Sequence, residues 1–327
     1  MLYMYVIMLF YMLISNSCSI KSNRLFSIKA IHRHHHHHHY YHHHCCYSSY
    51  KLYSSSSNDI NATISNNIVS VKPYITSGLL AVHKPISRSS ADIVSKIRYI
   101  LTTGISEKTG LPRKKCKVKV GHGGTLDPLA EGVLILGVGD GTKLLQDYLS
   151  GSKNYHAIAQ LGSETDTLDN TGNVTEVVDW THINRQKLGD TLEKFRGDIM
   201  QIPPMFSALR KDGKRLYELA REGKTIELEP RPVTVYSLEL LDKNKNGDTI
   251  DLPFFGLDIS CSGGFYVRSV ISDIAKSVET RAHMTALLRT KQGPFELNDC
   301  LQEQDWSYDK INAAIVRCSK KVGLDKN

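Results

Sequence analysis

From Gly78 onward, the pattern of apolar and polar positions predicts a mixture of strands and helices. Strands are expected where apolar residues form short runs or alternate with polar ones, at residues 78–82, 133–138, 155–161, 233–241 and 255–261. Helices are expected where apolar residues recur every three or four positions, at residues 93–101, 142–149, 188–195 and 267–278. The order of strands and helices shows no regular βαβ repeat, which favours an α+β fold.

Three smaller patterns refine this picture. Ser89 and Asp92 fit a capping box at the start of the first helix. Residues 114–120 alternate basic with small or apolar side chains, which predicts an exposed strand. Residues 198–231 form a long, basic excursion that contains several prolines.

Residues 1–77 differ in composition from the rest of the chain. The first 14 are nearly all apolar, no acidic residue precedes Asp59, and Lys, Arg and Ser are frequent. This composition is typical of a mitochondrial targeting segment, which we favour over a secretion signal or an extended gene model, with nucleus or cytoplasm as the alternative compartment. The histidines at residues 34–39 and 42–44 could bind metal, but low-complexity sequence is the better interpretation.

The net charge of the chain is less informative than its distribution. The formal value is +8, with a sequence pI of about 9.0. Five positive charges with no acidic counterpart precede Asp59, at Lys21, Arg24, Lys29, Arg33 and Lys51. The remainder is mildly basic, so composition points to a polyanionic partner without identifying it. Seven cysteines without a C-x-x-C pair argue against a disulfide framework or a structural zinc site.

Asp127 lies in the segment with the strongest chemical signal. Gly121, Gly123 and Gly124 precede it and Pro128 follows it. Glycines allow the backbone to approach a ligand closely, and a proline biases the residue before it towards an extended backbone. Two interpretations are open: Asp127 caps a short helix that begins at Pro128, or it is a functional carboxylate on a tight loop.

Residues 119–134 closely resemble the signature of TruB-type tRNA pseudouridine-55 synthases, and most of all their eukaryotic branch. Further matching segments follow in the family's order, at residues 81–85, 139–143, 165–169, 201–209, 231–236, 263–269 and 288–295. The resemblance implies the pseudouridine synthase fold, with a mixed, mostly antiparallel sheet, flanking helices and a basic thumb insertion. It divides the chain into an N-terminal extension (residues 1–77), a catalytic domain (78–315, with the insertion at 198–231) and a tail (316–327).

The resemblance also implies roles for three catalytic residues. Asp127 matches the catalytic aspartate, which engages the target nucleoside while its N-glycosidic bond is cleaved. Arg268 matches the arginine that pairs with this carboxylate, and a bidentate guanidinium would hold it in place and charged. Tyr155 matches the tyrosine that stacks on the target base and can handle a proton.

Five further residues match substrate-binding positions. His122 matches a histidine that helps to open the RNA loop when the target nucleotide is flipped out of its stack. Tyr266 and Leu288 match positions in the pocket wall, where plain core packing is the alternative. Lys84 and Lys143 could contact phosphate or support the site.

Residues 198–231 resemble the family's mobile insertion that grips the T-arm of tRNA. Arg210, Lys214 and Arg215 are expected to contact phosphates there. Glu218 and Glu222 fit the alternative of a solvated, charged helix.

The function implied by the resemblance is isomerisation of uridine to pseudouridine at position 55 of the tRNA T-loop. The same chemistry on mRNA stem-loops and a tRNA-folding chaperone are the alternatives. No cofactor and no metal are expected, because the isomerisation needs no redox partner or activated donor. We expect a monomeric RNA-binding protein with no obligate protein partner and no membrane association.

Overall fold

The computed structural model describes residues 76–324, and the predictions for residues 1–75 lie outside this range. The described part is built on a nine-stranded sheet. Its main path runs in the order β1 (Gly78–Lys84), β3 (Ala130–Val138), β12 (Ala282–Gln292), β4 (Lys153–Leu161), β11 (Phe254–Cys261), β10 (Arg231–Leu241) and β7 (Gly197–Gln201). β2 (Val120–His122) pairs with β3, and β13 (Phe295–Glu296) pairs with β12. Only β3 and β12 are parallel, so the predicted mixed, mostly antiparallel sheet is confirmed.

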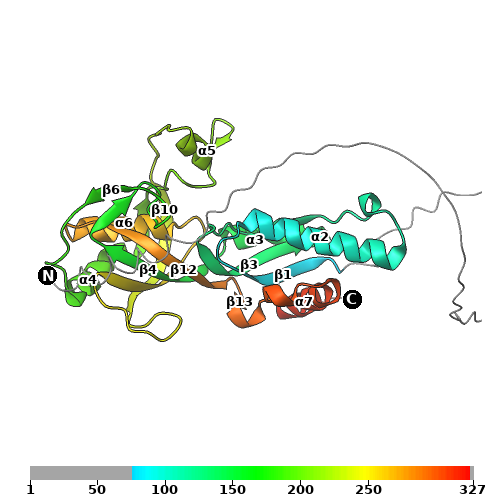
Figure 1. The fold of residues 1–327 in the computed structure, drawn as a ribbon. Coiled ribbons are helices and arrows are strands. Elements are labelled where there is room, and N and C mark those ends of the chain that lie inside the picture. The colour runs from blue at the N-terminus through cyan, green and yellow to red at the C-terminus, as the bar shows by residue number, and fades with distance from the viewer. Residues whose placement is uncertain (1–75, 325–327) are drawn as a thin grey trace, which may run out of the picture. The chain divides into compact units, whose positions relative to one another are not determined.

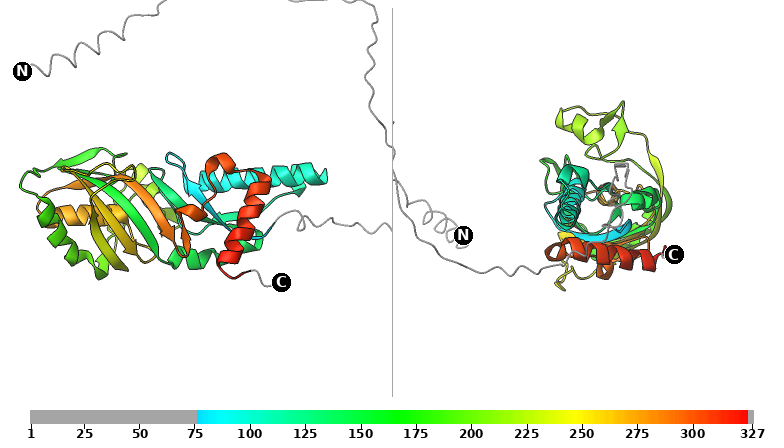
Figure 2. Two further views of the ribbon diagram at one scale, coloured as in Figure 1. Left: turned by 90° about the horizontal axis from the view of Figure 1, so that it is seen from below. Right: turned by 90° about the vertical axis from the view of Figure 1, so that its right-hand side faces the viewer.

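Helices flank this sheet (Figures 1 and 2). They are α2 (Ser90–Thr109), α3 (Leu145–Ser150), α4 (Arg185–Leu192), α5 (Leu216–Arg221), α6 (Val267–Ser277) and α7 (Tyr308–Lys321). Short 3₁₀ helices are η2 (Arg113–Lys115), η3 (Gly139–Leu144), η4 (Glu193–Phe195), η5 (Leu297–Asp299) and η6 (Glu303–Asp305). Two small ribbons complete the described fold, β5 (Ser163–Thr165) with β6 (Val174–Val177) and β8 (Arg210–Lys211) with β9 (Lys214–Arg215). None of the helices between residues 76 and 324 is long and apolar enough to cross a membrane.

Strand β1 separates two hydrophobic cores, because its side chains alternate between the faces of the sheet. Leu80 and Val82 belong to the larger core, which also takes the apolar sides of α2 and α6. Leu79 and Ala81 belong to a smaller core with Phe295. The short apolar run at residues 78–82, from which this strand was predicted, therefore corresponds to a strand buried on both faces.

Helix α2 begins at the predicted capping box. The Ser89 hydroxyl accepts a hydrogen bond from the Asp92 N–H at 3.2 Å, and the Asp92 carboxylate accepts one from the Ser89 N–H at 2.9 Å. The helix ends at Gly110, whose φ of 70° is in the left-handed region that favours glycine. Its 20 residues, at ~1.5 Å per residue, give a helix about 30 Å long.

Two segments differ from the sequence prediction. Residues 114–120 do not form the expected strand, because the chain makes the 3₁₀ turn η2 and finds a strand partner only at Val120, opposite Val138. The basic excursion is shorter than predicted, because residues 197–201 form β7, an edge strand paired with β10. Residues 202–230, which we call the thumb, carry α5 on a projection that stands off the sheet (Figure 1).

Candidate active site

The loop that carries Asp127 connects β2 to β3. The Gly123 N–H donates to the Ile135 carbonyl at 2.8 Å, which ties the loop to β3. The Ala130 N–H donates to the Asp127 carbonyl at 3.0 Å, which closes a turn before β3 begins. No helix starts at Pro128, so the interpretation of Asp127 as a helix cap is wrong. Because β3 starts immediately after the turn, the chain has no room for a helix there.

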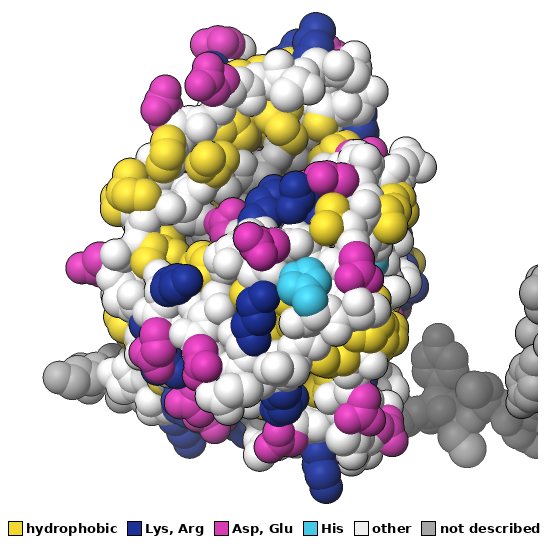
Figure 3. All heavy atoms as spheres, turned by 90° about the vertical axis from the view of Figure 1, so that its left-hand side faces the viewer, with side chains coloured by type: hydrophobic (Ala, Val, Ile, Leu, Met, Phe, Trp, Pro, Cys, Tyr) yellow, Lys and Arg dark blue, Asp and Glu magenta, His cyan; other side chains and the backbone are white. Residues whose placement is uncertain are grey.

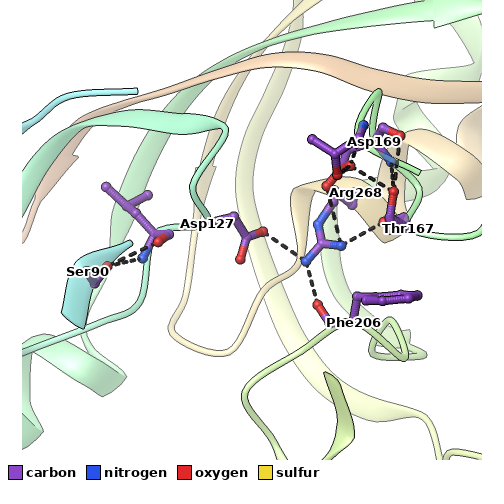
Figure 4. A network of polar contacts seen from close by, with 8 residues as sticks. Ser90, Asp127, Thr167, Asp169, Phe206 and Arg268 are labelled. Carbon is purple, nitrogen blue, oxygen red and sulfur yellow. Dashed lines mark hydrogen bonds and ion pairs between the residues drawn. The ribbon is translucent and has the colours of Figure 1, made fainter. Parts of the chain in front are cut away.

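Arg268 forms an ion pair with Asp127 (Figure 4). The distance from Arg268 Nη2 to Asp127 Oδ2 is 2.8 Å. The Arg268 side chain is 6% exposed, whereas that of Asp127 is 37% exposed. The arginine is therefore part of the protein interior, and the carboxylate is held at a surface that a substrate can reach.

The Arg268 guanidinium is shared among several acceptors and is not bidentate to Asp127. Nη2 also donates to the Phe206 carbonyl at 2.8 Å, and Nη1 donates to the Thr167 carbonyl at 2.7 Å. Nη1 lies 3.7 Å from the Asp169 carboxylate, which is buried. The expected pairing is present, but its rigidity comes from a network of carbonyls and a second carboxylate rather than from two parallel bonds to one carboxylate.

Tyr155 lies on β4 opposite Arg289 of β12, and their side chains form a hydrogen bond. Arg289 is 1% exposed and also donates to the carbonyls of Val133 at 2.6 Å and Gly124 at 3.3 Å. Burial raises the pKa of Tyr155, and the charge of Arg289 offsets part of this rise. The phenol is therefore protonated near neutral pH, and its hydrogen bond with Arg289 fixes its orientation.

Two more buried polar side chains lie next to Gly124 of the loop; Gln292 bonds to the loop, whereas Lys153 bonds to the end of α3 and to Gly151. Gln292 donates to the Gly123 carbonyl at 2.7 Å. The Lys153 ammonium donates to the carbonyls of Leu149 at 2.9 Å and Gly151 at 2.5 Å. Desolvation by burial lowers the pKa of Lys153 to about 8. The hydrogen bond from Gln292 therefore restricts the backbone of the loop at Gly123.

His122 lies at the end of β2, next to this loop. Its Nδ1 atom is buried and has no hydrogen-bond partner among the described residues. Burial lowers the pKa of His122, and the charges of Arg289 and Arg215 lower it further. The imidazole is therefore neutral near pH 7.

Tyr266 lies at the start of α6, directly before the helix that carries Arg268. Gln201 clamps its backbone, because the Tyr266 N–H donates to Gln201 Oε1 at 2.8 Å and Gln201 Nε2 donates to the Tyr266 carbonyl at 3.0 Å. Its phenol is partly buried, and desolvation raises its pKa. This position is compatible with a pocket wall, and the role stays a prediction.

The structure does not place Leu288 in the site. In the register of β12 with β4, Leu288 lies opposite His156, whereas Leu287 and Arg289 lie opposite Ala157 and Tyr155. Side chains alternate along a strand, so Leu288 points to the face away from Tyr155. Leu287 is the leucine on the face of the site, and the assignment of Leu288 to the pocket wall is wrong by one residue.

The two lysines with open roles differ in environment. Lys84 is fully buried, and its ammonium donates to the carbonyls of Pro85 at 2.9 Å and Arg88 at 2.5 Å. A contact with RNA phosphate is excluded by this burial, so Lys84 supports the loop between β1 and α2. Lys143 is exposed on η3 and forms an ion pair with Asp140 at 3.0 Å, and its contact with phosphate stays a prediction.

The thumb is joined to the catalytic arginine at its base. Phe206 supplies a carbonyl to Arg268, and the Ser269 hydroxyl donates to the Ile202 carbonyl at 2.9 Å. Figure 3 shows a hollow on one face of the molecule, with hydrophobic side chains above it and both basic and acidic side chains below it. The start of the thumb and the start of α6 therefore form one connected unit.

The predicted phosphate-binding residues of the thumb are exposed. Lys214 pairs with Glu222 at 3.0 Å, as the alternative of a solvated charged surface requires. Arg210 and Arg215 are exposed and have no ion pair within the described residues. Their contact with phosphate stays a prediction.

Sequence reasoning missed the buried polar groups around the site. Asp169, Lys153, Arg289 and Gln292 are all buried in the structure, on strands or in a loop. The available signal was a charged residue at a strand position whose side chain faces the core, because burial of an unpaired charge is costly. Which positions of each strand face the core could not be known before the strand pairing was known.

The site combines a fixed carboxylate with a protonated phenol and a neutral imidazole. Within residues 76–324, no group of three or more His, Cys, Asp or Glu side chains could hold a metal ion. The arrangement can support nucleophilic or general-base chemistry by Asp127.

Comparison with known proteins identifies relatives of this chain. Residues 113–267 match the family model described as TruB family pseudouridylate synthase, N-terminal domain. The chain is 45% identical to pseudouridylate synthase TRUB1 of Homo sapiens over 262 residues, which cover 79% of this chain and 73% of that protein. It is 41% identical to tRNA pseudouridine synthase B of Geobacter sulfurreducens over 221 residues, which cover 68% and 66%. A crystal structure of a Cbf5-Nop10-Gar1 complex matches with a TM-score of 0.51 and 26% identity, over 75% of this chain and 60% of that one.

Proposed function

This chain belongs to the TruB family and is a pseudouridylate synthase, an isomerase, and we propose that its substrate is uridine 55 in the T-loop of tRNA. The similarity to a tRNA pseudouridine synthase B supports a tRNA substrate. The exposed cations Arg210 and Arg215 on the thumb support an RNA-binding role near the site.

The proposed reaction balances without a co-reactant. The N1–C1′ glycosidic bond breaks, the base turns, and a C5–C1′ bond forms. The hydrogen lost from C5 is replaced by one gained at N1, so atoms and electrons are conserved. Asp127 acts on the nucleoside by attack on the base or the sugar, or by proton removal, and Tyr155 and His122 bound the space of the flipped nucleotide.

The observation that carries the proposal is the ion pair of Asp127 with Arg268. A carboxylate that is 37% exposed would normally be mobile and solvated, but here a buried guanidinium holds it 2.8 Å away. A carboxylate fixed before substrate binds needs no reorganisation during the reaction.

Replacement of Asp127 by Asn tests the assignment. Asn has nearly the same shape but no charge, so we expect kcat on a tRNA transcript to fall by about 10³-fold or more, with RNA affinity little changed. Release of tritium from C5 of labelled uridine measures the rate, and mapping of pseudouridine identifies the position. Asp147→Asn is the matched control, because this carboxylate is exposed on α3.

Several outcomes would contradict the proposal. An Asp127→Asn enzyme that still formed pseudouridine at the wild-type rate would remove Asp127 from catalysis. Modification of mRNA stem-loops with no product at position 55 would replace the proposed substrate. Correct tRNA folding without any tritium release by the wild-type chain would favour a chaperone.

A further inference from the structure

A row of basic side chains leads towards the catalytic loop and is not part of the site described above. We call it the basic ridge and define it by Arg113, Lys114, Lys115, Lys117 and Lys119. All five are exposed, and they flank the buried Cys116 and Val118. The buried positions hold the segment against the protein, so the cations are displayed on a fixed backbone.

The basic ridge has no acidic partner. Between Lys108 and Asp127 the chain contains no Asp or Glu. Among the described residues, no carboxylate forms an ion pair with a member of the ridge, whereas the exposed Lys108 at the end of α2 pairs with Asp309 at 2.9 Å. Five like charges on adjacent residues repel each other, which costs stability unless a polyanion neutralises them.

Helix α2 sets the distance of the ridge from the catalytic loop. Its first turn touches that loop, because the Leu126 N–H donates to the Ser90 hydroxyl at 2.8 Å. Tyr99, nine residues further along, is ~14 Å from the start of the helix, and the Arg113 guanidinium lies 4.4 Å from the centre of its ring. Leu111 and Cys116 contact Ser106 and Thr109 in the last turns of the helix, about 24 to 28 Å from its start.

The ridge runs back along α2 to the active site. Arg98 on α2 donates to the Val120 carbonyl at 2.9 Å, at the point where the basic segment enters β2. Figure 1 and the right view of Figure 2 both place this segment on the side of α2 from which the thumb projects. An RNA whose target nucleotide enters the catalytic loop could therefore extend along the ridge.

We propose that the basic ridge binds the phosphate backbone of the RNA stem that continues beyond the target hairpin, about 14 to 28 Å from the catalytic loop. This inference rests on the proposed function, because it assumes an RNA substrate, and it names a second contact surface for that substrate. Lysines on an exposed, fixed segment contact phosphates without reading sequence. The ridge therefore contributes affinity for a long, structured RNA and little for an isolated T-arm hairpin.

The test compares two RNAs on one variant. In the triple variant Lys114→Gln, Lys115→Gln and Lys117→Gln, we expect the Kd for full-length tRNA to rise by about tenfold, and the slope of log K against log salt to become shallower by roughly 2 to 3. The Kd and kcat for the isolated T-arm hairpin should stay within about twofold of the wild-type values.

A charge-matched control removes the effect of net charge. Lys194→Gln, Lys243→Gln and Lys320→Gln also remove three exposed lysines without an ion pair in the described structure, and they lie on other elements. This control should bind both RNAs as the wild type does. Equal losses in the control and the ridge variant would overturn the proposal.

Three other results would also overturn it. These are unchanged tRNA binding by the ridge variant, equal loss of affinity for tRNA and hairpin, and ridge-dependent binding to vesicles of anionic lipid but not to tRNA. Failure of the wild-type enzyme to modify position 55 would instead reject the proposed substrate. The two failures are distinguishable, because tRNA binding is measured without catalysis.

Discussion

At the residue scale, the site combines one accessible carboxylate with several buried polar groups. Arg268 is held by two carbonyls and lies near two carboxylates, and Arg289 is held by two carbonyls and a phenol. Within the described residues, neither Arg289 nor Lys153 forms an ion pair. These two cations lie beneath the catalytic loop and have no carboxylate partner. They therefore make the electrostatic potential more positive at the surface that RNA approaches.

The buried Lys153 should make stability depend on pH. Its pKa is lowered by burial from 10.5 to about 8, so between these values the unfolded chain binds more protons than the folded one. The free energy of unfolding therefore rises with pH in this window, by about 1 kcal/mol between about pH 7.5 and about pH 9. Above pH 9 the thiols of Cys261 and Cys300, with pKa values raised to about 12 by burial, act in the opposite direction.

Urea unfolding at these two pH values, for the wild type and Lys153→Met, measures this term. The variant should lack the part of the stability gain that comes from Lys153. Lys84 also has a pKa lowered to about 8, but it is present in both proteins, so its contribution is the same in both. If both chains show the same change with pH, Lys153 does not carry the proposed linkage.

How much of the site could be predicted from the sequence differs from residue to residue. The neighbourhood of Asp127 and Arg268, 141 positions apart, came from resemblance to a family, because no local pattern brings them together. Leu288 was assigned to the pocket wall from the resemblance alone, and only the register of β12 with β4 shows that Leu287 is the leucine on the face of Tyr155. The roles of Arg289 and Lys153 depend on tertiary burial and could not be read from their neighbours.

At the element scale, β3 is the centre of the site. It pairs with β1 and β2, and it forms the parallel pair with β12. Alternation and apolar runs predicted β1, β3, β4, β10 and β11 and the helices α2, α3, α4 and α6, but they missed β12 and α7. The pairing order and the parallel junction depend on contacts between distant segments. The basic segment at residues 114–120 shows why alternation alone is insufficient, because it buries alternate residues without a partner strand.

Gly132 is the residue that allows β3 and β12 to meet. Its φ is 105°, and a Cβ there would lie 2.3 Å from the Arg289 carbonyl oxygen. We expect Gly132→Ala to lower the free energy of unfolding by about 3 kcal/mol or more, because backbone strain and a clash with the backbone add together.

Gly189→Ala is the matched control for this prediction. Gly189 lies inside α4, and an added Cβ would meet only Leu240 at 3.6 Å, an ordinary contact. This change should raise the free energy of unfolding by about 0.5 to 1 kcal/mol. A Gly132→Ala chain as stable as the control would show that the junction tolerates a side chain.

At the scale of the whole molecule, the described residues contain all the groups assigned to the site and to the basic ridge. The first described backbone contact is that of the Thr76 N–H, which donates to Asn312 on α7 at 2.9 Å. The domain boundary expected near residue 77 stays a prediction.

Removal of residues 1–75 tests whether the catalytic unit is self-sufficient. The shortened chain keeps Asp127, Arg268, the thumb and the ridge, so its kcat/KM on tRNA should stay within about twofold of that of the full chain. Rates of both chains at one ionic strength measure this. A loss of a hundredfold would show that the N-terminal segment takes part in catalysis or RNA binding.

The connection of the thumb to Arg268 has a consequence for fidelity. The Phe206 carbonyl at the base of the thumb is one of the acceptors that orient the arginine, and the arginine in turn orients Asp127. An RNA that fits the thumb poorly would leave this chain of contacts misaligned, even if a uridine reached the pocket. Selection of the correct uridine would then occur at the moment of chemistry as well as at binding, and wrong RNAs would dissociate before reacting.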